Sequence, residues 1–339
     1  MNQSKKTLSD IAIMRPILIT SIIIGHAFAI FGNSQSWPIP QGSTQINGYT
    51  WITPTFISFA LQAFVFVSGY LFAYKNPAQA PSNKWAFIKS KIKRIILPSL
   101  IFGILYILIL HPQNYEHTSV ILEILNGAGH LWFLPMLFWC YVFGVIGYKF
   151  IHKASISAFL LLGILSFASF LLPNYFGFAI ALHYFIYYVL GMWVFINKDR
   201  ILFISSKYKH LILIPWIVIG VLCVIKIACI NITSTTPSIL LTCIKVATNI
   251  LLGVIGSLSL WITINLCIKD NNIKIRGDIW FGLYIYHQFI MMLLYYHTRL
   301  PLIVNSIGLP WLVLATTYGS SVLLVILTLK TKIGRWLIG

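Results

Sequence analysis

Long apolar runs recur along the whole chain and constrain its fold more than any other feature. Each is close to the length of about 20 residues that an α-helix needs to cross a hydrocarbon core. The ten runs lie at 11–31, 52–74, 94–111, 131–151, 154–172, 176–196, 211–230, 246–268, 279–297 and 309–329. They lack the two-residue alternation of an outer-membrane β-barrel, and backbone polar groups in lipid must be satisfied internally. The sequence therefore predicts an all-α, polytopic membrane helix bundle with about ten transmembrane helices, forming one domain over residues 1–339.

The distribution of charge agrees with this class. Hydrophobic residues make up 58% of the chain and charged residues only 9%, which excludes a soluble fold. A net charge of +18 would ordinarily suggest nucleic-acid binding. Here, however, 20 of the 24 Lys and Arg residues fall on one side of the predicted spans, and only Lys226, Lys245 and Arg299 fall on the other. Because positive segments stay in the cytoplasm, we expect both termini to be cytoplasmic, contact with membrane lipid and no nucleic-acid partner.

The first apolar run has an alternative interpretation as a cleavable signal peptide. Lys5 and Lys6 precede it, and residues 27–29 have a small-x-small pattern. The run is longer than a usual signal-peptide core and is interrupted by Arg15 and His26, which favours a retained helix. The five cysteines lie within or beside the spans and show no CxxC or paired spacing, so we expect neither a disulfide framework nor a metal site.

Two connecting segments have unusual compositions. The predicted external segment 32–51 has no charge and is rich in Gly, Pro, Ser, Gln and aromatic residues. It is suited to stacking against sugar rings, or it is an ordinary polar connector with interfacial tryptophans. The predicted cytoplasmic segment 75–93 is basic. It either holds an anionic ligand or enforces topology and contacts acidic headgroups.

Two ionisable residues in the first span carry an energetic cost in lipid unless they face the bundle interior or a watery cavity. Arg15 and His26 are eleven residues apart, which on a helix is about 20° past three full turns and roughly 16 Å along the axis. One helix face thus presents a cation near the cytoplasmic end and an imidazole much deeper. Taken singly, Arg15 is compatible with a snorkelling residue and His26 with a packing histidine. Their shared face favours a functional pair.

Four other motifs stand out along the chain. They are FVFVSGYL at 64–71, the basic pair Lys93-Arg94 before Pro98, LWFL at 131–134 after His130, and YIYH at 284–287. Each has a structural interpretation as well: small residues at Ser68 and Gly69 permit close helix packing, Trp132 is at the interface where belt tryptophans gather, and the basic pair follows the positive-inside rule. His287 is a second histidine near the middle of a span.

Together these motifs, in this order along nearly the whole chain, resemble the acyltransferase-3 family of integral membrane acyltransferases. The sequence departs from the family pattern at one place: many members have an acidic residue three or four positions before the first-helix arginine, whereas Asp10 lies five before Arg15. Because the sequence ends soon after its tenth predicted span, we also expect it to lack the extracytoplasmic hydrolase-like domain of longer members. We therefore expect an acceptor to be recognised by the membrane domain, its loops or a partner protein.

The resemblance implies transfer of an acyl group, usually acetyl from acetyl-CoA, to a hydroxyl of an extracytoplasmic or lipid-linked glycan. It places the protein in a bacterial cytoplasmic membrane as a multi-pass enzyme that needs no metal. His26 would deprotonate the acceptor or carry the acyl group transiently, since histidine supplies a base active near neutrality. Arg15, Lys93 and Arg94 would bind the phosphates of coenzyme A. The residues expected at the substrate site are Ser68, Tyr70, His130, Trp132 and His287, of which Trp132 and His287 either line the acyl cavity or orient His26.

Two other classes remain as alternatives. A transporter or glycan exporter also places polar residues in a bundle, but the chain lacks paired Gly/Pro-interrupted spans in corresponding halves and has few acidic residues within the spans for ion coupling. A structural subunit of an envelope assembly would use Arg15 and His26 only for packing.

Overall fold

The computed structural model describes residues 8–32, 37–76, 80–110, 120–151, 156–235, 238–267 and 277–338. All regular secondary structure in these ranges is helical, which confirms the predicted all-α bundle. Six of the basic residues used to predict topology lie outside the described residues: Lys5, Lys6, Lys153, Lys269, Lys274 and Arg276.

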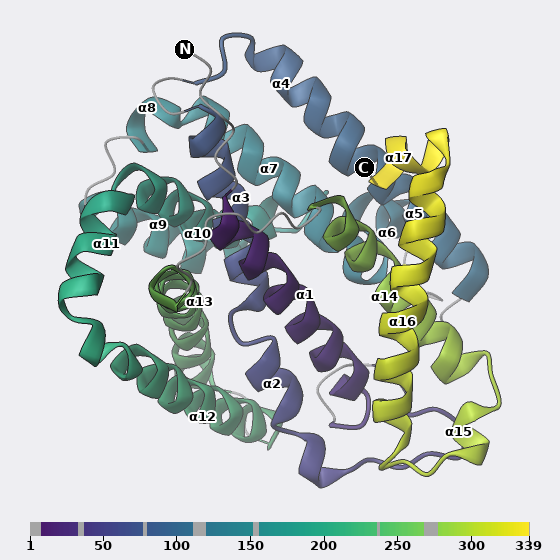
Figure 1. The fold of residues 1–339 in the computed structure, drawn as a ribbon. Helices are drawn as coiled ribbons and strands as arrows, with labels where there is room; N and C mark the ends of the chain where they lie inside the picture. Colours follow the sequence, from purple (N-terminus) through teal and green to yellow (C-terminus); the bar gives the residue numbers. More distant parts are fainter. Residues whose placement is uncertain are drawn as a thin grey trace. The chain divides into compact units, whose positions relative to one another are not determined.

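Helices follow one another along the described ranges (Figure 1). The α-helices are α1 (Ser9–Ala29), α2 (Ile52–Phe56), α3 (Ala60–Lys75), α4 (Lys84–Lys91), α5 (Leu97–Leu110), α6 (Val120–Asn126), α7 (Phe133–Ile146), α8 (Tyr148–Ile151), α9 (Ile156–Ala168), α10 (Phe178–Ile196), α11 (Lys198–Lys207), α12 (Leu213–Thr235), α13 (Ile239–Cys267), α14 (Gly277–Tyr296), α15 (Leu300–Ile303), α16 (Leu309–Lys330) and α17 (Lys332–Ile338). Short 3-10 or π-helical turns are η1 (Asn47–Tyr49), η2 (Ile92–Ile96), η4 (Gly129–Trp132), η5 (Ser169–Leu171) and η6 (Lys209–Leu211).

A helix lies over each of the ten predicted spans. Among the described residues, eight helical segments are long and apolar enough to cross a membrane. The helices at the fifth and ninth predicted spans are outside that group. The first of these is short, covering Ile156–Leu171, while α14 has the polar residues His287 and Gln288 in its interior. The chain is therefore a multi-pass membrane protein.

The helices form two compact units. Unit 1 comprises Met1–Phe64 and Lys198–Leu323, and unit 2 comprises Val65–Asn197 and Leu324–Gly339. The long helices α3 and α16 each contribute residues to both units.

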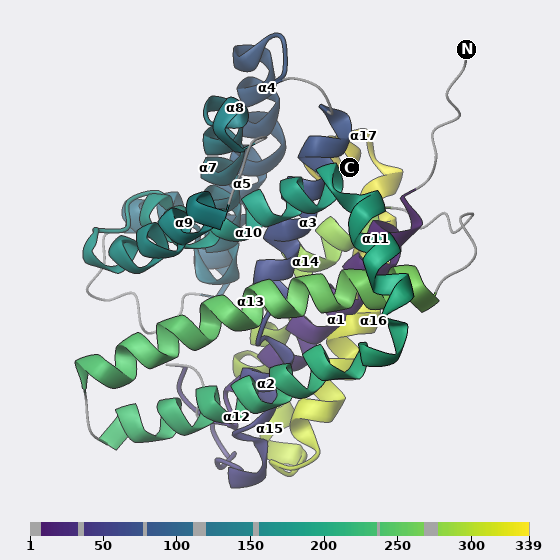
Figure 2. The ribbon, with the colours of Figure 1, turned by 90° about the vertical axis from the view of Figure 1, so that its left-hand side faces the viewer.

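In unit 1, α1 packs against α2, α13 and α14, and α12 runs along α13 (Figure 2). Helix α1 is unbroken over its 21 residues although Pro16 lies inside it. Small residues set the closest approaches: a Cβ at Gly25 would collide with the side chain of Ile57, and one at Gly256 with the ring of Phe59. Close packing of this kind is typical of membrane helices, where van der Waals contact drives association.

In unit 2, α10 packs against α7 and α9. Residues of α3 also approach α10 closely, because a Cβ at Gly69 would meet the backbone at Tyr188 and one at Gly191 would meet the backbone at Phe66. The packing role predicted for the small residues of the second span is therefore confirmed at Gly69.

Contacts between connecting segments join regions that the charge distribution predicts to share a side of the membrane. In unit 1, Thr44 N donates to Ser306 Oγ at 2.9 Å, which joins two predicted external segments. In unit 2, Tyr148 Oη donates to the carbonyl of Asn76 at 2.6 Å, which joins the predicted cytoplasmic end of the fourth span to the predicted cytoplasmic segment 75–93.

Candidate functional site

The structure brings the two intramembrane histidines of the motifs together. His26 lies on α1 and His287 on α14, and the two helices pack against each other within unit 1. The ring centroids are 5.6 Å apart, with the planes inclined by 35°. His287 is fully buried, whereas His26 is only partly buried. A pair of imidazoles therefore lies where α1 packs on α14 in unit 1, and the partly exposed member belongs to α1.

The backbone around His287 determines which of its nitrogens carries a proton. Its Nδ1 lies 2.7 Å from the carbonyl oxygen of Tyr284 and 3.1 Å from that of Leu283. A carbonyl oxygen only accepts hydrogen bonds, so Nδ1 must be the protonated donor. In the neutral ring, Nε2 then carries a lone pair and is an acceptor. The motif YIYH thus fixes a tautomer by hydrogen bonds within one helical turn.

Two buried hydroxyl groups fix the backbone on either side of His26. Thr53 Oγ1 on α2 donates to the carbonyl of Gly25 at 2.8 Å. Tyr295 Oη on α14 donates to the carbonyl of Ala27 at 2.6 Å. Both are buried, and they reach α1 from different helices. His26 is consequently held in place by its neighbours in the chain.

Arg15 lies on the same continuous helix as His26 and is also partly buried. The predicted spacing of the two residues along one helix requires this continuity. Five positions earlier, Asp10 anchors the beginning of α1. One of its carboxylate oxygens accepts a hydrogen bond from Ile11 N at 2.8 Å, and the other accepts one from Trp261 Nε1 on α13 at 2.9 Å. Asp10 thus ties α1 to α13, a partnership with a buried tryptophan that no local sequence pattern indicated.

The segment with His130 and Trp132 belongs to unit 2. Both residues lie on the 3-10 turn η4, just after Gly127, whose φ of +90° favours glycine. The buried ring of His130 lies 6.2 Å from that of Tyr106, and the partly buried ring of Trp132 lies 6.0 Å from that of Tyr184. Both residues are packed among aromatic rings.

The remaining candidates also lie in unit 2. Tyr70 is buried, with its ring edge-on to Phe195 at 5.3 Å, and Ser68 is partly buried. Lys93 and Arg94 are exposed on the π-helical turn η2, and Lys93 Nζ lies 5.7 Å from the ring centroid of Trp336. Pro98 explains this turn, because it lacks the N–H that would bond the carbonyl of Arg94 in an α-helix.

The predicted site residues therefore fall into two groups. Unit 1 contains Arg15, His26 and His287, and the structure brings the two histidines together. Unit 2 contains Ser68, Tyr70, Lys93, Arg94, His130 and Trp132. In the described part of the chain, no group of His, Cys, Asp and Glu side chains is arranged to hold a metal ion.

Sequence reasoning missed the residues that support His26, namely Thr53 and Tyr295. Thr53 lies at the start of a span, where hydroxyl residues are common, and Tyr295 lies in an aromatic run at the end of α14. Neither has a local signal, because the carbonyls they bind are 28 and 268 positions away in the chain.

Comparison with known proteins gives one match. The sequence model of the acyltransferase-3 family, described as an acyltransferase domain, matches residues 8–330. No curated protein and no solved structure matches the chain.

Proposed function

Since the chain belongs to the acyltransferase-3 family of membrane acyltransferases, we propose that it transfers an acetyl group from cytosolic acetyl-CoA to a hydroxyl of an extracytoplasmic or lipid-linked glycan in a bacterial cytoplasmic membrane. The observation that carries this proposal is the placement of His26. Its ring lies beside His287, its backbone is fixed on both sides, and it shares a helix with Arg15.

The reaction needs a base and an acyl acceptor. In the proposed mechanism, an imidazole nitrogen of His26 takes the proton of the acceptor hydroxyl as that oxygen attacks the thioester carbonyl. The new C–O bond forms, the C–S bond breaks, and the proton passes from His26 to the thiolate of coenzyme A. The products are the O-acyl glycan and free coenzyme A. Because His26 is held by groups from two helices, little reorganisation is required at the moment of reaction.

His287 is proposed to orient His26. With Nδ1 donating to backbone carbonyls, Nε2 of the neutral ring can accept an N–H from a neighbouring donor. If His26 donates to it, the other nitrogen of His26 is left unprotonated and able to act as the base. This role is the same as that of the group that orients the histidine in a catalytic triad.

Arg15, Lys93 and Arg94 stay candidates for the phosphates of coenzyme A. Arginine forms bidentate bonds to phosphate, and the exposed Lys93-Arg94 pair offers adjacent cations. Replacing each cation separately shows which of them contributes to donor affinity.

Release of coenzyme A from radiolabelled acetyl-CoA by the purified, detergent-solubilised protein tests this function. We expect turnover or labelling of the wild type and its loss in His26→Ala and Arg15→Ala at matched thermal stability. His210→Ala is the control, since His210 is an exposed residue on η6. Near-normal acetylation by a folded His26→Gln variant would end the assignment of His26 as the base. A wild type that neither binds nor turns over acetyl- or succinyl-CoA would favour the transporter alternative.

A further inference from the structure

In unit 1 a hydrogen-bonded clasp joins a segment predicted to be external to the connection between the ninth and tenth predicted spans together with the adjoining span ends. We define it as residues 37–51 with residues 296–311. Thr44 N donates to Ser306 Oγ at 2.9 Å, and Tyr49 Oη donates to the carbonyl of Ile307 at 2.7 Å. Tyr296 Oη donates to the carbonyl of Pro38 at 2.6 Å. Such repeated pairing holds segments that are more than 250 positions apart in the chain.

One turn of the clasp requires glycine. Gly42 has a φ of +86°, a backbone conformation that residues with a Cβ rarely adopt. A Cβ there would also lie 2.8 Å from the side chain of Leu302 and 3.2 Å from the carbonyl oxygen of Pro301. The close approach of the two segments at this turn therefore depends on glycine at position 42.

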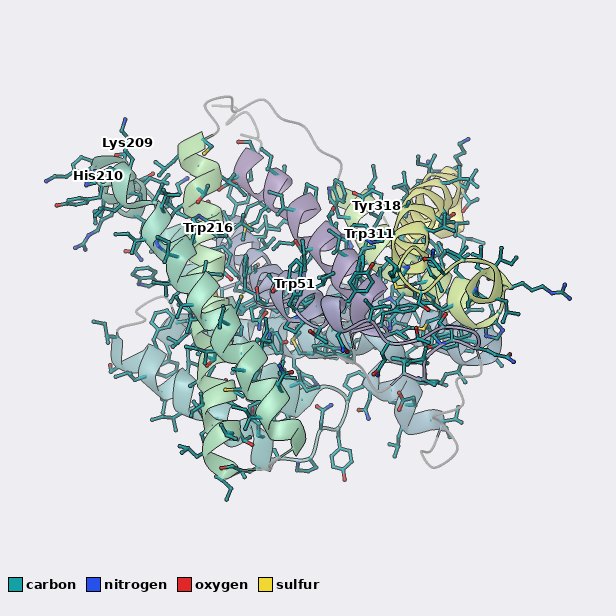
Figure 3. The ribbon with its side chains drawn as sticks, turned by 90° about the horizontal axis from the view of Figure 1, so that it is seen from below. Trp51, Lys209, His210, Trp216, Trp311 and Tyr318 are labelled. Carbon is teal, nitrogen blue, oxygen red and sulfur yellow. The ribbon has the colours of Figure 1, made fainter. Side chains whose placement is uncertain are left out.

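The clasp holds an exposed tryptophan in a fixed orientation. Trp311 Nε1 donates to Tyr49 Oη at 3.2 Å, and that hydroxyl in turn donates to Ile307. The ring of the buried Phe28 meets both aromatic rings edge-on, with centroid distances of 4.9 Å to Tyr49 and 4.8 Å to Trp311. Trp311 nevertheless remains 55% exposed. Figure 3 views this end of unit 1 and labels Trp311 together with Trp51, which is 50% exposed.

This arrangement differs from that of an interfacial anchor. A belt tryptophan lies at the headgroup level, with an amphipathic ring whose polar N–H can face the water. The N–H of Trp311 is instead used within the protein, while a large part of its side chain remains open. A rigid aromatic face binds a ligand without the entropic cost of ordering a mobile side chain.

The surroundings of Trp311 indicate the chemistry of its ligand. Residues 37–51 contain no charged side chain, and Arg299 is the only Lys, Arg, Asp or Glu in 296–311. Near Tyr49 in the sequence, the exposed Gln45 and Asn47 have amide donors and acceptors. The exposed Asn305 beside Ser306 has an amide donor, while its Oδ1 accepts from Gly308 N at 2.7 Å. An apolar face with neutral hydrogen-bonding partners suits the C–H face and hydroxyls of an uncharged sugar ring.

We propose that Trp311, fixed by Tyr49 and Phe28, is a stacking platform for a neutral pyranose ring of the acceptor glycan, with the neighbouring amides binding its hydroxyls. Phe28 lies two residues after His26 on α1, about 3 Å along the helix axis and about 200° around it, so the platform packs on a different face of α1 from the proposed base, at a similar level along the helix. This inference rests on the proposed function, because it concerns how the acceptor is held.

Binding of full-length, detergent-solubilised protein to immobilised neutral and anionic oligosaccharides, without acyl donor, tests the platform. We expect wild type to bind at least one neutral oligosaccharide, and Trp311→Leu to bind it about 3- to 10-fold more weakly through loss of aromatic stacking. Trp311→Phe keeps an aromatic face and should bind more tightly than Trp311→Leu. Trp85→Leu is the matched control, since Trp85 is an exposed tryptophan on α4 in unit 2.

The proposal is overturned if wild type binds no neutral oligosaccharide, if it binds only anionic ones, or if Trp311→Leu binds as wild type does at matched thermal stability. Because this measurement needs no acyl transfer, its failure is distinct from failure of the proposed function, which is read from acetyl-CoA turnover and the His26 variants.

Discussion

At the scale of single residues, the site depends on how the backbone of His26 is held. Its two flanking carbonyls accept hydrogen bonds from Thr53 and Tyr295, which come from different helices. A buried hydroxyl that bonds a carbonyl contributes about 1 kcal/mol to stability. Its effect on a reaction can be larger, because small displacements of a catalytic group slow the chemical step.

We predict that Tyr295→Phe lowers kcat for acetyl transfer about 3- to 10-fold with little change in KM, because only the position of His26 changes. Tyr148→Phe is the matched control: it also removes a tyrosine hydroxyl that donates to a carbonyl at 2.6 Å, but in unit 2. Both variants should lose about 1 kcal/mol of stability. Equal kcat values for the two variants would show that Tyr295 contributes only to stability. Steady-state kinetics and thermal unfolding in detergent provide both readouts.

A second residue-scale prediction concerns His287. His287→Asn retains a side-chain donor and acceptor but alters their positions, so we expect a loss of kcat smaller than that of His26→Ala and a displaced pH–rate profile, because the environment of the base changes. The pH dependence of kcat in both variants and in wild type measures this. A His287→Asn profile that superimposes on that of wild type would rule out an orienting role.

At the scale of helices, glycines determine which elements approach closely. Gly69 and Gly191 let residues of α3 and α10 meet at backbone distance in unit 2, whereas a Cβ added at Gly163 on α9 would have no neighbouring atom within 4 Å. Replacement of glycine by alanine is therefore expected to change stability in opposite directions at these positions. In a close contact an added methyl group costs packing energy, and in open space it favours the helix.

We predict that Gly191→Ala destabilises the protein by about 1–3 kcal/mol through overpacking. Gly163→Ala should be neutral or stabilising by up to about 1 kcal/mol, since alanine is the better helix former. Thermal unfolding followed by circular dichroism in detergent measures both. Equal shifts in melting temperature would contradict the close contact between α3 and α10.

At the scale of the whole molecule, the side of the membrane on which each connecting segment lies determines which segments the proposed donor and acceptor can reach. The predicted topology places the segment around Tyr175 outside and that around Tyr208 in the cytoplasm. Both tyrosines are exposed, at 65% and 47%, which makes them a matched pair for labelling.

We predict that Tyr175→Cys reacts with a membrane-impermeant maleimide in intact cells, whereas Tyr208→Cys reacts only after permeabilisation. Both substitutions are made in a chain whose five native cysteines are replaced. The reverse pattern would contradict the predicted topology and place the clasp on the side opposite to the proposed glycan acceptor.

The sequence by itself determined the helical class, the placement of a helix over each predicted span, of which eight are long and apolar enough among the described residues to cross a membrane, and the continuous first helix that carries Arg15 and His26. These follow from local periodicity and hydrophobicity, which are properties of neighbouring residues. Only the tertiary structure decided that His287 lies beside His26, that Thr53 and Tyr295 hold its backbone, and that Phe28 and Tyr49 fix Trp311. These contacts depend on which helix faces pack together. Contacts between residues as far apart as 268 positions cannot be predicted from the periodicity of the sequence, which reflects only neighbouring residues.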